Sequence, residues 1–173
     1  MRWVWISVLG LALVLFSQPG SGGAGGEAGA AVAGAPAPAF ELVTFAGEAY
    51  SKDSLKGRPT LLVFWASWCP VCQKELPVLG RFYEKDRPTQ LRVISIGFSD
   101  LRGKIEGYVK AHPKSFVFPT AFDIDNDVAQ AFKITATPTL VLLDAQGNIV
   151  MVHRGAGVLQ NPQFREFLAA LKG

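Results

Sequence analysis

The residues best suited to chemistry in this 173-residue chain are its two cysteines, Cys69 and Cys72. A disulfide across so short a separation closes a very small loop and adds little stability to a fold. A structural zinc site needs four ligands, and the two histidines, His112 and His153, form no ligand motif with the cysteines. The pair is therefore more typical of thiol–disulfide exchange, and we expect neither a metal nor an organic cofactor. The alternatives from these residues alone are a chance pair or half of a metal site shared between subunits.

The segments around the pair predict how it is positioned. Thr60–Trp65 (TLLVFW) is a continuous apolar run of strand length, as expected for a strand buried on both faces. After a short turn, Cys69 falls at the amino end of a predicted helix, where unpaired backbone N–H groups and the helix dipole stabilise a thiolate. Pro70 suits the first helical position, and Cys72 lies one turn deeper. We therefore predict that Cys69 attacks a disulfide and that Cys72 resolves the product.

Apolar periodicity and turn residues predict the remaining elements of an α/β domain. Strands that alternate with helices, followed by a hairpin and a closing helix, give a three-layer sandwich with a mixed central sheet. The last helix has the clearest signals, with Asn161 as its cap, Pro162 in its first turn and one apolar stripe. The other predicted strands lie at 40–45, 48–50, 91–98, within 116–122, at 139–143 and at 149–153, and the other helices begin after Cys69, at Ser99 or Asp100, and at Asp127.

The amino terminus predicts export of the protein. Met1 and Arg2 precede the apolar run Trp3–Phe16, so we interpret residues 1–18 as a signal peptide or a membrane anchor, and favour the anchor. Residues 19–37 are almost entirely Gly, Ala, Pro and Ser, a composition that cannot offset the entropy of ordering and predicts a flexible linker. The folded domain is expected at residues 38–173, outside the cytoplasm and either membrane-anchored or secreted.

Charge argues against a nucleic-acid partner. Lys and Arg outnumber Asp and Glu by 17 to 14, and the basic residues are scattered singly instead of forming a patch. The length is enough for one domain with its own core and too short for two. We expect a single monomeric domain that binds no nucleic acid.

The segment LLVFWASWCPVCQKELP around Cys69 and Cys72 resembles the active-site segment of the thioredoxin superfamily, and most of all its extracytoplasmic, membrane-tethered TlpA/ResA branch. The resemblance extends over residues 38–173. It implies a thioredoxin-like fold with an N-terminal β-hairpin and an extra helix and strand at about 100–122. Residues 38–40 and 55–59 resemble the opening segment of that branch.

The resemblance also assigns roles to residues that form the substrate cleft. Thr137 and Pro138 resemble the superfamily's cis-proline loop, which packs beside the cysteines and presents backbone groups to an extended substrate. Trp68 and Pro70 flank Cys69 and would shape the same cleft. The sequence alone permits a trans proline at the start of a strand, so the cis bond is an expectation from the resemblance.

Glu75 stands three residues after Cys72, on the same face of the predicted helix. In the family branch, a glutamate at this spacing is proposed to tune or deprotonate the inner cysteine. Ordinary thioredoxins place a buried acid in the preceding strand, where this chain has Val63, and that departure favours the role for Glu75. The alternative is an exposed helix glutamate near Lys74.

The function that these features predict is reduction of disulfides in exported client proteins that carry cysteine pairs. Extracytoplasmic space is oxidising, so the electrons must come from a membrane donor protein. The resemblance implies clients of the cytochrome c maturation or copper-site assembly type. The leading alternative is a copper-binding chaperone that uses Cys69 and Cys72 as soft ligands. A peroxidase of the peroxiredoxin type is disfavoured because no threonine stands three residues before Cys69.

Overall fold

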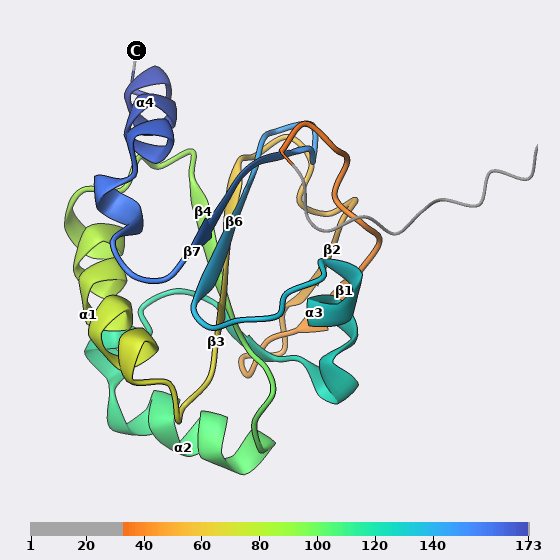
Figure 1. Ribbon diagram of the computed structural model, residues 1–173, viewed down its shortest axis with the longest axis vertical. Coiled ribbons are helices and arrows are strands. Elements are labelled where there is room, and N and C mark those ends of the chain that lie inside the picture. The colour runs from red at the N-terminus through yellow and green to blue at the C-terminus, as the bar shows by residue number, and fades with distance from the viewer. Residues whose placement is uncertain (1–32, 173) are drawn as a thin grey trace, which may run out of the picture.

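The computed structural model describes residues 33–172, and its centre is a five-stranded mixed sheet (Figure 1). The spatial order of the strands is β5-β4-β3-β6-β7, with β3, β4 and β5 parallel to one another and β6 and β7 antiparallel to their neighbours. Their bounds are Thr60–Trp65 for β3, Arg92–Gly97 for β4, Thr120–Phe122 for β5, Thr139–Leu143 for β6 and Ile149–Arg154 for β7. All six residues of β3 are buried, which confirms the interpretation of its apolar run.

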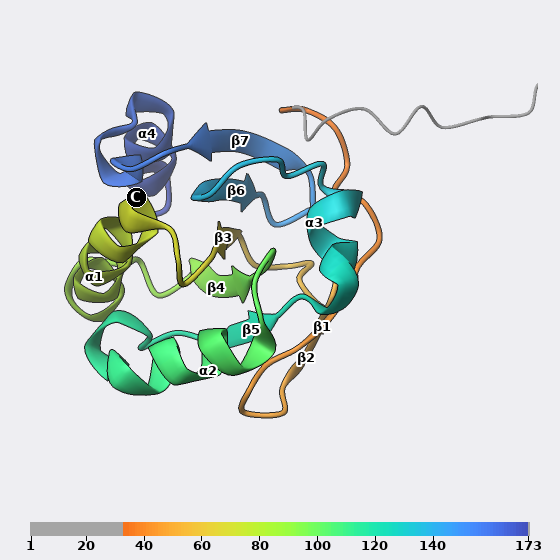
Figure 2. The ribbon, with the colours of Figure 1, turned by 60° about the horizontal axis from the view of Figure 1, so that its bottom comes forward.

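Helices and the N-terminal segment cover the two faces of the sheet (Figure 2). Helices α1, α2 and α4 pack against one face, through a cluster that includes Leu76, Ile105 and Phe164. Helix α3 and the N-terminal segment cover the other face, through Phe40, Leu42 and Phe132 among others. The bounds are Pro70–Lys85 for α1, Arg102–Ala111 for α2, Asp127–Ala131 for α3 and Pro162–Ala170 for α4. The predicted three-layer sandwich is confirmed.

The N-terminal β-hairpin is also confirmed. Its strands β1, Glu41–Val43, and β2, Ala49–Ser51, pair antiparallel as a separate two-stranded sheet. A bridge between Thr44 and Ala121 joins the hairpin to the β5 edge of the central sheet. The extra helix and strand expected at about residues 100–122 are α2 and β5.

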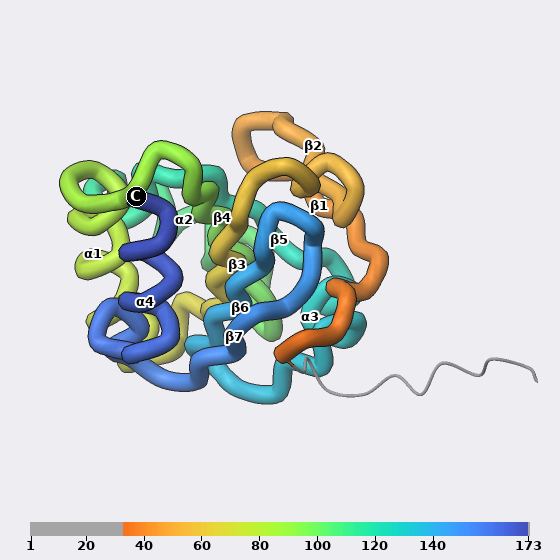
Figure 3. Tube along the Cα trace, turned by 90° about the horizontal axis from the view of Figure 1, so that it is seen from above, coloured from red at the N-terminus to blue at the C-terminus, as the bar shows by residue number. Residues whose placement is uncertain are grey.

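The described contacts begin before the predicted domain boundary at residue 38. The amide of Gly34 donates to the carbonyl of Ile149, and Pro36 pairs with Asn148 at the turn that joins β6 and β7. Figure 3 shows this segment beside β7. The predicted signal or anchor at 1–18, and the linker up to residue 32, lie outside the described residues. Within residues 33–172, no helix has the length and apolar character needed to cross a membrane.

Two predicted helix caps were wrong. Helix α2 begins after Leu101, which has no side-chain cap, because the carboxylate of Asp100 instead accepts from the amide of Ser67, in the turn after β3. Helix α3 is not capped by Asp127, since its first free amides donate instead to the buried carboxylate of Asp123, which lies before the helix. The predicted Asn161 cap of α4 is confirmed.

Candidate active site

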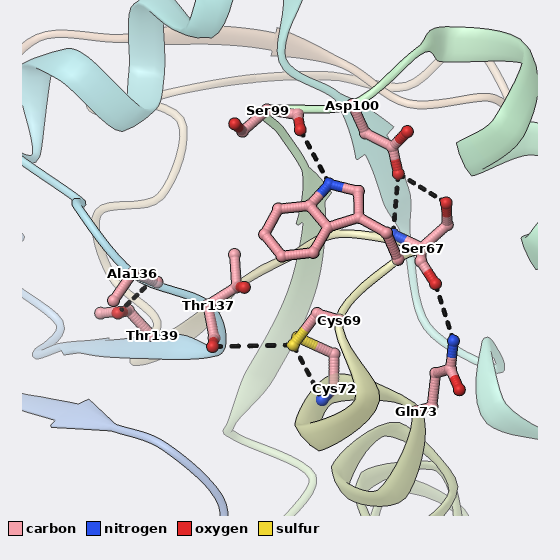
Figure 4. The surroundings of a disulfide bond; sticks show 10 residues. Ser67, Cys69, Cys72, Gln73, Ser99, Asp100, Ala136, Thr137 and Thr139 are labelled. Atoms are coloured by element: carbon pink, nitrogen blue, oxygen red, sulfur yellow. Dashed lines mark hydrogen bonds between the residues drawn. A yellow bond between two sulfur atoms is a disulfide. The ribbon is translucent and has the colours of Figure 1, made fainter.

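The cysteine pair lies where β3 turns into α1, and the two sulfur atoms form a disulfide (Figure 4). Cys69 is the N-cap of α1, with extended backbone angles of φ −84° and ψ 109°, and Pro70 opens the helix. The Cys69 sulfur accepts a hydrogen bond of 3.1 Å from the amide of Cys72. This sulfur therefore occupies the position of a capping oxygen, where the free N–H groups of a helix stabilise negative charge.

Burial separates the roles of the two cysteines. Cys72 is completely buried, whereas Cys69 retains 3% of its surface and is flanked by the exposed residues Trp68, Pro70 and Val71. An incoming disulfide therefore meets the sulfur of Cys69 first, and Cys72 can only act from within. The arrangement supports attack by Cys69 and resolution by Cys72.

The predicted cis-proline loop packs beside this pair. The bond between Thr137 and Pro138 is cis, as expected from the resemblance. The Thr137 carbonyl oxygen lies 3.6 Å from the Cys69 sulfur (Figure 4). Two bonds hold the loop: the Thr139 hydroxyl donates to the Ala136 carbonyl, and the Gly155 amide donates to the Pro138 carbonyl. Backbone groups of this loop therefore stand next to the attacking sulfur, where an extended substrate would lie.

Glu75 is buried, so the alternative of an exposed glutamate near Lys74 was wrong. Its two carboxylate oxygens accept hydrogen bonds from the amides of Gly157, at 3.0 Å, and Val158, at 3.1 Å. The carboxylate thus ties α1 to the loop before α4. Its hydrogen bonds go to that loop and not to Cys72, so its role in proton exchange stays a prediction.

The structure adds a set of contacts that the sequence analysis missed, on the turn before Cys69. The Asp100 carboxylate accepts from the amide of Ser67 at 2.8 Å and from its hydroxyl at 2.6 Å. The indole N–H of Trp68 donates to the carbonyl of Ser99 at 3.0 Å. A signal was present in the sequence: Ser99 and Asp100 directly follow a predicted strand, and the carboxyl ends of neighbouring parallel strands meet at one edge of a sheet.

Opposing effects act on the pKa of Asp100. Partial burial raises it, but the hydrogen bonds from Ser67 and the Leu101 amide, together with the nearby Lys104 ammonium, outweigh burial. The pKa of Asp100 therefore lies below its usual value, and the carboxylate is charged at neutral pH.

In the part of the chain that the structure describes, no three His, Cys, Asp or Glu side chains come together as a metal site. The ring of His153 is engaged at both nitrogens, by the Ala156 carbonyl and the Asn161 amide group. His112 stacks on Tyr108, at 4.1 Å between ring centroids, and contacts its carbonyl. Neither ring approaches the cysteines through a hydrogen bond.

Comparison with known proteins agrees with this chemistry. The sequence model of the AhpC/TSA family matches residues 33–152. The thiol-disulfide oxidoreductase ResA of Halalkalibacterium halodurans is 26% identical over 170 residues, which cover 98% of this chain and 94% of that protein. The thioredoxin-like protein YneN of Bacillus subtilis is 32% identical over 124 residues, covering 70% and 71%.

A solved structure with the same fold extends the agreement. The crystal structure of StoA from Bacillus subtilis has a TM-score of 0.64 and 28% identity, and the match covers 77% of this chain and 96% of StoA. The disulfide at the start of α1, the cis-proline loop beside it and these relatives converge on one conclusion. The chain belongs to the AhpC/TSA family of thioredoxin-like proteins and is a thiol–disulfide oxidoreductase of the ResA and StoA type.

Proposed function

We propose that this protein is an extracytoplasmic reductase for disulfides in exported client proteins. The reduction would serve the maturation of cytochrome c or the assembly of copper sites. The observation that carries the proposal is the placement of Cys69, which caps α1 and faces the Thr137 carbonyl. This geometry favours a thiolate on the one sulfur that a client can reach.

The reaction consists of two successive thiol–disulfide exchanges. In the reduced protein, the Cys69 thiolate attacks one sulfur of a client disulfide, so that a mixed disulfide forms and the other client sulfur leaves as a thiolate. The Cys72 thiolate then attacks the Cys69 sulfur, which reforms the Cys69–Cys72 disulfide and releases the second client thiolate. Two electrons pass to the client, and solvent supplies the two protons that convert its thiolates to thiols at neutral pH.

A membrane electron donor completes the cycle. The apolar run Trp3–Phe16 and the Gly- and Ala-rich residues 19–37 support a tether that keeps the domain near a membrane. In an oxidising compartment the Cys69–Cys72 disulfide must be reduced again after each turnover, and a donor protein in the same membrane would supply those electrons.

The direction of exchange is tested by the reduction potential of the pair. The full chain is equilibrated in dithiothreitol redox buffers, and its thiols are counted by alkylation. A potential near the roughly −270 mV of thioredoxin, or lower, supports a reductase. A potential near the roughly −120 mV of a strong oxidant would show that the protein introduces disulfides, and would refute the proposal.

The client class is tested with defined peptides. Cys72→Ser should trap a mixed disulfide with an oxidised peptide that carries the Cys-x-x-Cys-His haem-attachment motif, because the resolving thiol is missing. Cys69→Ser is the matched control and should trap none. Equal reduction rates for this peptide and for one with the same cysteines in a scrambled sequence would refute the cytochrome c client class. Tight binding of one copper ion per reduced chain would support the copper chaperone instead.

A further inference from the structure

The turn between β3 and Cys69 is held at every polar group of Ser67. Its amide and hydroxyl both donate to one oxygen of Asp100, and its carbonyl accepts from the side chain of Gln73 at 2.8 Å (Figure 4). Gln73 belongs to α1, and Asp100 follows β4. Ser67 therefore links the loop after β4 to the first turn of the catalytic helix.

The loop that carries Asp100 is itself fixed. Ser99 has a left-handed backbone, with φ +52°, and its amide donates to the side-chain oxygen of Asn126 at 2.6 Å. Its carbonyl accepts from the indole of Trp68. The second oxygen of Asp100 accepts from the Leu101 amide at 2.7 Å. Because both ends of the carboxylate are engaged, it cannot turn into solvent without breaking several bonds at once.

The geometry points to Asp100 as a positioning residue for the exchange reaction, which fixes the turn before Cys69 and places a permanent negative charge beside the amino end of α1. This role rests on the exchange chemistry proposed above and adds a means of tuning it. The Asp100 carboxylate is 2.8 Å from the amide of Ser67, two residues before Cys69, and the turn between them is tight, since the Cys69 amide donates to the Ala66 carbonyl at 3.2 Å. Salt screens charges over about 10 Å at 0.1 M, so a charge held at this turn can act on the start of α1.

The sign of the effect follows from the charge. A negative group near the Cys69 sulfur disfavours its thiolate, in opposition to the helix amides that favour it. Lys104 lies close enough to act on Asp100 and offsets part of this charge. The carboxylate therefore moderates the reactivity of Cys69 and favours the disulfide over the reduced pair, as suits a reductant.

Asp100→Asn tests the charge while retaining an oxygen that can accept from Ser67. Cys69 in the reduced full chain should be alkylated about threefold faster at neutral pH, and the equilibrium with glutathione should move toward the reduced protein. Asp86→Asn is the matched control, since it makes the same charge change at the exposed C-cap of α1 and should alter neither value. Superposition of the Asp100→Asn and wild-type pH profiles of alkylation would overturn the inference.

Ser67→Ala provides a second test that does not depend on folding of the first variant. Ser67→Ala keeps the charge of Asp100 and removes the hydroxyl that donates to this carboxylate. Without that hydrogen bond the negative charge is less offset and disfavours the Cys69 thiolate more, so alkylation of Cys69 should be slower than in the wild type. A rate equal to or above that of the wild type would overturn the inference. Because alkylation needs no client, failure of this inference is distinguishable from failure of the proposed function, which appears as a wild-type protein that leaves client disulfides intact.

Discussion

Replacing Glu75 by Gln should destabilise the domain strongly, although the two side chains have nearly the same shape. The carboxylate accepts from two backbone amides, of Gly157 and Val158, at a buried site. Gln keeps one acceptor oxygen and turns an NH₂ group toward the other amide. One buried N–H then loses its partner, which costs about 1–3 kcal/mol, and the remaining bond loses its charge assistance.

The expected loss of unfolding free energy is about 3 kcal/mol. For a domain of this size, that corresponds to a fall of about 10 °C in Tm. Urea unfolding of oxidised protein, followed by tryptophan fluorescence, measures the free energy. Glu84→Gln is the control on the same helix, because Glu84 is exposed, and it should change stability by no more than about 0.5 kcal/mol.

Equal stability of the Glu75→Gln and Glu84→Gln proteins would refute the view that this carboxylate holds the loop before α4. A separate measurement addresses proton exchange with Cys72. The rate at which Cys72 resolves a mixed disulfide is followed across pH in both variants. If Glu75 takes the Cys72 proton, the pH profile of Glu75→Gln changes shape, whereas a purely structural role lowers the rate without changing the profile.

Three further predictions concern separate features of the structure. Gly80→Ala should lower the free energy of unfolding by about 1–3 kcal/mol, because the added Cβ would lie 2.5 Å from the Lys114 carbonyl oxygen. Gly103→Ala in α2, where the added Cβ meets no atom within 4 Å, should raise it by about 0.5–1 kcal/mol. Urea unfolding measures both, and a change of the same sign in the two variants would contradict the close packing at Gly80. Burial raises the pKa of Asp123 despite two amides that lower it, so the folded protein binds a proton at Asp123 more tightly than the unfolded chain does. The contribution of Asp123 to stability is therefore largest below the usual pKa of 3.8 and declines as pH rises through the raised pKa. Asp123→Asn should abolish this decline when unfolding is measured across pH. Trp68→Ala should slow reduction of a client peptide severalfold and leave the exchange rate with dithiothreitol nearly unchanged, because Trp68 is 59% exposed beside Cys69. An equal loss with both substrates would show that the indole acts on the disulfide itself.

The elements whose signals are local could be predicted from the amino-acid sequence. The unbroken apolar run Thr60–Trp65 predicted the central strand, because a strand covered on both faces has no polar side. Cys69 before Pro70, at the start of an amphipathic helix, predicted both the thiolate site and the order of attack. The prediction of a cis bond before Pro138 rested on the family resemblance, since the position of the proline alone also allows a trans bond.

Which polar groups bond to each other depends on how distant segments pack, and local sequence does not show it. Glu75 binds amides 82 and 83 residues away along the chain, and Asp100 binds Ser67 across 33 residues. Distant donors also explain why Asp100 does not cap α2, since its carboxylate accepts from Ser67 instead. A carboxylate is a strong acceptor, and it bonds to whichever unpaired N–H groups the fold brings within reach, so neighbours in sequence predict its partner only when no distant donor is closer.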